Sequence, residues 1–127
     1  MAAAPQEIQE VIEQAKQAWL DNNGIAFAEL FAPSGEFWVP GHRYQGQDQI
    51  LQAFQEFADA SRVEEIEIRN LVTQADQAFV EWSWQEQERA TGKVSRTEDA
   101  IAIDFQGDRI QRWREYIDAQ SPLNQKD

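Results

Sequence analysis

Two acidic residues, Asp99 and Glu115, stand among apolar and aromatic residues in the C-terminal part of the sequence. Asp99 opens the run DAIAIDF, and Glu115 lies in WREYID, two positions after Trp113. Carboxyl groups that share an apolar site have unequal pKa values, because desolvation and mutual repulsion disfavour the second charge. Such a pair supplies a general acid and a general base near neutral pH. The two residues therefore predict proton-transfer chemistry if the fold brings them together.

The first sixty residues carry the hydrophobic period that is typical of helices. Apolar residues recur every three to four positions between residues 8 and 20 and again between residues 50 and 58. Between these stretches, Gly, Pro and Asn residues mark breaks. The predicted elements are a helix that ends at Asn22, Asn23 and Gly24, a short helix Ile25–Phe31 stopped by Pro33, an extended segment Glu36–Val39 ended by Pro40 and Gly41, and a third helix capped by Asp48.

From Val63 onward the hydrophobic period changes to two, which is typical of strands. Short polar turns interrupt the pattern near residues 74–77, 90–93 and 106–108, which predicts an antiparallel meander. Helices followed by strands favour one α+β domain over residues 1–127, with helices covering one face of a curved antiparallel sheet. The predicted strands run from Val63 through Val72, from Phe79 to Gln87, from Val94 to Phe105 and from Arg109 to Asp118, and residues 119–127 are expected to form a frayed tail.

Alternation along the third predicted strand sorts its residues into two faces. One face is apolar and must be the inner one, and the neighbouring strand has two tryptophans at the matching positions. The predicted inner face carries Thr97, Asp99, Ile101, Ile103 and Phe105, joined by Trp82 and Trp84.

Composition excludes several classes of partner. The chain has 11 Lys and Arg against 23 Asp and Glu, a formal net charge of −12, which repels phosphate groups. We therefore expect neither nucleic acid nor a membrane surface as a partner. With no Cys and a single His, the sequence has no metal-ligand spacing and predicts no metal or other cofactor. The N-terminus lacks the basic start and apolar run of a secretion signal, so the expected location is the cytoplasm.

Three segments carry a resemblance that extends over nearly the whole chain. They are ELFAPSGEFWVPG at residues 29–41, GQDQILQAF at residues 46–54 and FQGDRIQRWREYID at residues 105–118. In this order they resemble the SnoaL-like branch of the nuclear transport factor 2-like superfamily, which includes ketosteroid isomerases, limonene epoxide hydrolase and polyketide cyclases. The resemblance implies a cone-shaped, cystatin-like α+β fold with a central cavity between the curved sheet and the N-terminal helices.

The family's register implies which residues of the last strand face that cavity. Glu115 would then share it with Asp99. The register points Trp113, Glu115 and Ile117 inward and Arg112, Arg114 and Tyr116 outward.

Only part of the relatives' catalytic sets is matched in this sequence. Glu115 stands where SnoaL and limonene epoxide hydrolase have an Asp, so the resemblance implies an acid or base there. Trp82 and Trp84 replace the polar pair of the epoxide hydrolase, and Val39 stands at the base position of ketosteroid isomerases. Ile101 falls near the helper histidine of SnoaL. The resemblance therefore implies the pocket but no named reaction.

The candidate residues fall into two groups. The catalytic candidates are Glu115, Asp99 and His42, the last in a predicted loop near the cavity mouth, where an imidazole could act as a base or orient a ligand. The candidates for ligand contact are Phe37, Trp38, Val39, Trp82, Trp84, Thr97, Ile101 and Trp113.

Each assignment has a structural alternative. Asp99 could lie at the wet mouth, and Glu115 could pair with Arg96 or Arg114. The tryptophans could simply fill the cone, and His42 could be an ordinary exposed residue.

The function expected from these residues is that of a small-molecule pocket protein. It would be a cofactor-independent isomerase, cyclase or hydrolase that acts on an apolar or polycyclic compound with Glu115 as the acid or base. One alternative is a module that binds a hydrophobic ligand without catalysis. Another is a dimeric protein-interaction domain with a vestigial cavity. The outer sheet face is expected to form a homodimer, because its composition resembles an interface: Ser83, Ala100, Ala102, Arg112, Arg114 and Tyr116.

Overall fold

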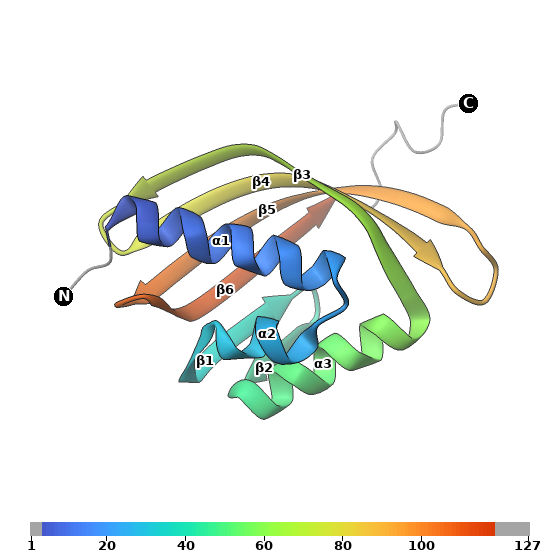
Figure 1. Cartoon of the computed structure of the whole chain (residues 1–127), viewed down its shortest axis with the longest axis horizontal. Coiled ribbons are helices and arrows are strands. Elements are labelled where there is room, and N and C mark those ends of the chain that lie inside the picture. The colour runs from blue at the N-terminus through green and yellow to red at the C-terminus, as the bar shows by residue number, and fades with distance from the viewer. Residues whose placement is uncertain (1–3, 119–127) are drawn as a thin grey trace.

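The computed structural model describes residues 4–118, so the expected tail at 119–127 lies outside the described residues. Within this range the chain forms three helices and six strands, which confirms an α+β fold (Figure 1). In chain order they are α1 (Pro5–Leu20), α2 (Gly24–Glu29), β1 (Phe31–Val39), β2 (His42–Gln45), α3 (Gln47–Ala60), β3 (Ser61–Gln74), β4 (Gln77–Glu88), β5 (Val94–Gln106) and β6 (Arg109–Asp118).

The break between α1 and α2 falls at the predicted asparagines. Asn22 has a positive φ of 56°, a conformation that Asn tolerates better than most residues, and it ends α1. The side chain of Asn23 accepts a hydrogen bond from the backbone N–H of Ala26 at 3.0 Å and so caps α2. Helix α2 ends at Glu29, two residues earlier than predicted, because Phe31 already belongs to a strand.

Helix α3 begins one residue before the predicted cap. Its N-cap is Gly46, with a φ of 88°, and Asp48 lies in the first turn instead of capping the helix. The positive φ explains the difference, because the chain turns most easily at the glycine. The helix buries Ile50, Ala53 and Phe54.

The six strands form one sheet in the order β2-β1-β6-β5-β4-β3. The predicted meander is confirmed as the antiparallel run β3 to β6. Two features differ from the prediction. Residues 40–44 are not a loop, because Gly41, with a φ of 83°, lets the chain reverse into β2, and β1 pairs in parallel with β6.

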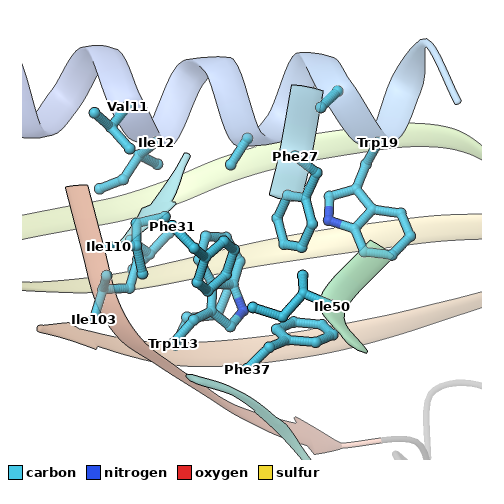
Figure 2. Close-up of a cluster of buried hydrophobic side chains, with 14 of the residues drawn as sticks. Val11, Ile12, Trp19, Phe27, Phe31, Phe37, Ile50, Ile103, Ile110 and Trp113 are labelled. Atoms are coloured by element: carbon cyan, nitrogen blue, oxygen red, sulfur yellow. The ribbon is translucent and has the colours of Figure 1, made fainter. Parts of the chain in front are cut away.

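The helices cover one face of the sheet, which we call the inner face. Figure 1 shows α1 crossing β3 to β6, with α2 and α3 toward β1 and β2. Figure 2 shows the core between these layers, where Trp113, Phe27 and Phe31 have no exposed surface. The rings of Phe27 and Trp113 meet edge to face at 5.5 Å. In the described part of the chain, no helix is long and apolar enough to cross a lipid bilayer.

Candidate functional site

A pocket of about 390 Å³ opens between α3 and the inner face of the sheet. We call it the central pocket. It lies beside the packed core, and the helices contribute Trp19 from the end of α1 and wall residues within positions 53–57 of α3. Its described wall consists of Trp19, Phe37, Val39, Tyr44, Ala53, Glu56, Phe57, Trp84, Glu86, Thr97, Asp99, Glu115 and Ile117.

The sheet register brings Asp99 and Glu115 together on this wall. Asp99 of β5 lies opposite Ile117, and Ile101 lies opposite Glu115 of β6. Asp99 and Glu115 are therefore diagonal neighbours on the same face, a separation that longer side chains can bridge. This confirms the predicted inward direction of both carboxyl side chains.

Indole and hydroxyl donors hold the two carboxyl groups. Asp99 is 4% exposed and accepts hydrogen bonds from Trp82 Nε1 at 3.2 Å and Thr97 Oγ1 at 3.3 Å. Glu115 accepts a hydrogen bond from Trp113 Nε1 at 2.9 Å. Because Trp82 and Trp113 are themselves buried, these hydrogen bonds hold the two carboxyl groups in fixed positions.

The pKa of Glu115 is raised well above its ordinary value of 4.5. Burial is the largest cause, followed by the hydrogen bond with Asp99 and the negative charge of Asp99, whereas the Trp113 donor acts in the opposite direction. The Glu115 side chain is half-buried because part of it lines the pocket, yet protein atoms surround its carboxyl group. Glu115 therefore keeps its proton to higher pH than an ordinary glutamate does.

The arginines that could have paired with Glu115 lie on the opposite side of the sheet, which we call the outer face. There Arg96 contacts Glu65 at 3.3 Å, and Arg114 contacts Asp104 at 3.6 Å. Asp99 is also buried, contrary to the alternative that placed it at a wet mouth. Strand alternation is the reason, because Arg114 and Glu115 are adjacent and must point to opposite faces.

Three aromatic rings meet on the pocket wall: Trp19 of α1, Phe57 of α3 and Trp84 of β4. Trp84 meets Trp19 at 5.2 Å and Phe57 at 5.6 Å, both edge to face. Trp84 also donates its Nε1 hydrogen to Glu86 at 2.7 Å, which fixes the indole relative to that carboxylate. The pocket thus combines apolar walls with a few oriented polar groups, as small-molecule sites do.

The predicted ligand-contact residues separate into three locations. Phe37, Val39, Trp84 and Thr97 line the central pocket. Three others are packed in the core and are not part of the described wall: Trp82, Ile101 and Trp113, with exposures of 1%, 2% and 0%. They face inward as predicted, but helices α1 and α2 cover their part of the sheet.

Trp38 lies on the outer face, where the Arg43 guanidinium stacks over its ring at 3.7 Å. His42 also lies outside the central pocket. It lines a separate pocket of about 530 Å³ that includes Trp38, Arg43 and one side of Glu115. The predicted role of His42 as a base therefore finds no geometric support in the central pocket.

Several wall residues were not among the sequence candidates: Trp19, Tyr44, Ala53, Glu56, Phe57, Glu86 and Ile117. Glu86 could have been found by extending the alternation of Trp82 and Trp84 by two residues. Phe57 was predicted on the buried side of α3, and that helical face also carries Ala53 and Glu56. Nothing in the sequence pattern marked Tyr44 as a wall residue, because the strand that carries it, β2, was not predicted.

In the described range 4–118, no three side chains of His, Asp or Glu gather in a way that could hold a metal ion. The chemistry that the arrangement offers is proton transfer by Glu115 and Asp99 to or from a molecule in an aromatic pocket.

Solved structures of the same fold support this architecture. A protein from Catenulispora acidiphila with a ketosteroid isomerase-like fold, in complex with trimethylamine, has a TM-score of 0.78 at 19% identity over 84% of each chain. An M. tuberculosis LEH-like epoxide hydrolase has a TM-score of 0.79 at 13% identity over 93% of this chain and 87% of its own. A proposed SnoaL-like polyketide cyclase from Jannaschia has a TM-score of 0.80 at 11% identity over 97% of this chain and 94% of its own.

A comparison with curated proteins finds no match. At these identities the solved structures establish the fold alone. The sequence model of the SnoaL-like domain matches residues 12–113, a range that includes Asp99 and ends two residues before Glu115. The chain therefore belongs to the SnoaL-like family.

Proposed function

We propose that this protein binds a small, mainly apolar molecule in the central pocket and acts on it by proton transfer through Glu115. The observation that supports the proposal best is the Asp99–Glu115 pair on the wall of an aromatic pocket. A carboxyl whose pKa is raised by burial and by a second carboxyl keeps its proton to higher pH than an ordinary glutamate. Such a group is suited to general acid catalysis.

The proposed chemistry needs no electron transfer. Glu115 gives its proton to an oxygen atom of the bound molecule, and Asp99 takes a proton from a neighbouring carbon. Glu115 loses one proton and Asp99 gains one, so the total charge of the pair does not change in an isomerisation or cyclisation. Passage of one proton from Asp99 to Glu115 then restores the starting state. In a hydrolysis, Asp99 takes the proton from an attacking water molecule, and Glu115 gives its proton to the leaving oxygen.

The relatives favour this class of reaction without naming the substrate. An epoxide hydrolase and a proposed polyketide cyclase share the fold, and each name implies chemistry on a small organic molecule. The Catenulispora protein in complex with trimethylamine is a further chain of this fold that holds a small molecule.

Native mass spectrometry of gently purified protein, followed by denaturation, tests the proposal. A small molecule released only on denaturation identifies the compound to use in turnover assays. We expect Glu115→Gln to abolish turnover while folding is retained, and Glu13→Gln, an exposed position on α1 that removes the same charge, to behave as wild type. Turnover of the compound at the wild-type rate by Glu115→Gln would refute the acid role. A compound that remains unchanged after long incubation would favour binding without catalysis.

We also propose that the outer face packs against a second copy of the chain. Tyr116 and Phe79 are 57% and 44% exposed there, beside small residues such as Ala102. Charges of both signs on this face allow it to complement itself. We expect sedimentation to give a dimer that Tyr116→Glu converts to the 14.7 kDa monomer. A wild-type monomer at micromolar concentration would overturn this proposal.

A further inference from the structure

The charged residues of the central pocket have one sign. Among the described residues on its wall, the acidic side chains are Glu56, Glu86, Asp99 and Glu115, and no basic side chain lines it. The pKa of Glu115 is raised, so the negative charge of the wall comes first from the other three. Glu56 is exposed, Glu86 and Glu115 are half-buried, and Asp99 is buried. An anionic ligand would be repelled by these groups and by the net charge of −12.

Aromatic rings accompany the carboxyl groups of the pocket. Trp84 donates to Glu86 at 2.7 Å, and Trp19 and Phe57 pack edge to face against the Trp84 ring. The Trp113 donor orients Glu115. The face of an aromatic ring attracts a cation within about 6 Å of its centre, and a neighbouring carboxylate adds to this attraction.

A neutral ligand would gain less from this wall. Filling the pocket with an apolar molecule removes water from the carboxyl groups and replaces it with no opposite charge, which opposes binding. A ligand with an ammonium group supplies that charge. Its apolar body can cover Phe37, Val39 and Phe57, whose side chains need no hydrogen-bond partner.

We propose that the central pocket selects an apolar molecule that carries a protonated or quaternary amine. The ammonium group lies among Trp84, Glu86 and the Asp99–Glu115 pair, and the apolar body lies against the remaining aromatic wall. This inference rests on the proposed function, because it takes the central pocket as the ligand site and names the class of ligand.

The test compares two probes of the same shape, phenyltrimethylammonium and its carbon isostere tert-butylbenzene, by NMR titration of the indole N–H signals at neutral pH. We expect phenyltrimethylammonium to bind at least about tenfold tighter, the size expected for a desolvated cation over an aromatic ring. The signal of Trp84 should shift, and that of Trp38 on the outer face should not. Equal or tighter binding of tert-butylbenzene would overturn the inference.

Paired variants separate the pocket from the general negative field of the protein. Glu86→Gln removes one charge but keeps an oxygen that can accept the Trp84 hydrogen bond, and Glu13→Gln removes one charge on the exposed side of α1. We expect Glu86→Gln to weaken phenyltrimethylammonium binding several-fold and not to weaken tert-butylbenzene binding. Equal weakening by Glu13→Gln would assign the preference to net charge and refute the inference.

The outcomes also distinguish this inference from the proposed function. If the neutral probe binds the central pocket at least as well as the cation, the pocket remains a ligand site and only the amine preference fails. If neither probe shifts Trp84, the amine preference fails, and native mass spectrometry decides separately whether the pocket holds another molecule.

Discussion

Both faces of the sheet carry a tryptophan that donates a hydrogen bond to a glutamate of the same strand, but the two glutamates lie in different surroundings. On the outer face, Trp38 donates its indole hydrogen to Glu36 at 2.8 Å, and on the inner face Trp113 donates to Glu115 at 2.9 Å. Each pair spans two positions of one strand. The difference lies in the neighbours, because Arg112 stands 3.8 Å from Glu36, whereas Glu115 has Asp99.

This comparison shows how burial and a second carboxyl together set the chemistry of Glu115 apart. An arginine neighbour stabilises the charged form of a carboxyl, and the result is an ordinary ion pair. A second carboxyl in a buried setting stabilises the protonated form, and the result is a group that can donate a proton. Arg114 and Glu115 are adjacent in sequence, so strand alternation alone assigns them to these two environments.

The largest expected effect concerns catalysis. Glu115→Gln keeps the shape of the side chain and removes its proton transfer, so we expect turnover of a substrate found for this protein to fall by about 100- to 10,000-fold. Glu36→Gln removes a carboxylate with the same indole partner on the outer face and should leave turnover within about twofold, since Glu36 does not touch the pocket. Steady-state rates measure both. Similar losses in the two variants would mean that the faces do not differ in function.

The next effect concerns stability. Trp113 is fully buried among aromatic rings, so Trp113→Ala should lower the free energy of unfolding by about 3–5 kcal/mol. Trp38 is only partly buried, and Trp38→Ala should cost about 1 kcal/mol. Urea denaturation followed by circular dichroism compares them. A loss for Trp38→Ala as large as that for Trp113→Ala would show that the outer face is also a core, as a tight dimer would make it.

A third effect depends on pH. Between the pKa of an unfolded glutamate and the raised pKa of Glu115, the folded state binds more protons than the unfolded state, so stability falls as pH rises through this window. The contribution is fully present below the unfolded pKa and is lost above the folded one. Each pKa unit corresponds to about 1.4 kcal/mol.

Glu115→Gln lacks this proton, so its stability relative to wild type should increase with pH across the window and then level off. Asp99→Asn provides the matched test, because it leaves Glu115 buried and removes the neighbouring charge that raises its pKa. The pH-dependent fall should be smaller in Asp99→Asn than in wild type. Unfolding curves from pH 4 to pH 9 measure it, and a slope of the opposite sign would contradict the assignment of Glu115 as the proton holder.

Strand alternation explains what the sequence could predict about the site. The period of two correctly placed Asp99 and Trp84 on the inner face, and the register implied by the family resemblance correctly placed Glu115 there. Alternation shows which face of the sheet a side chain lies on, but it does not show whether that side chain is packed in the core or lines the pocket. Trp82 and Trp84 share a face, yet Trp82 lies in the packed core and Trp84 lines the pocket, because the positions of the helices decide which part of the sheet stays open.

The region around β1 and β2 was less predictable for a physical reason. Phe37, Trp38 and Val39 are all apolar, so the segment has no alternation that could distinguish its faces. The structure turns Phe37 inward, while Trp38 lies on the outer face between two guanidinium groups, with Arg43 at 3.7 Å and Arg112 at 5.4 Å. A cation stacked on a ring makes an outward tryptophan stable, and that arrangement depends on β2, which the sequence pattern did not indicate.

The smallest expected effect concerns the ion pairs of the outer face. Asp104 lies 3.7 Å from Arg112 and 3.6 Å from Arg114, with about a quarter of its side chain exposed. Water screens such pairs, so Asp104→Asn should lower the free energy of unfolding by no more than about 1 kcal/mol, and added salt should reduce that loss. Urea denaturation at low and high salt measures it. A loss well above 1 kcal/mol that salt does not change would place Asp104 in a buried environment, as a second copy of the chain on the outer face would provide.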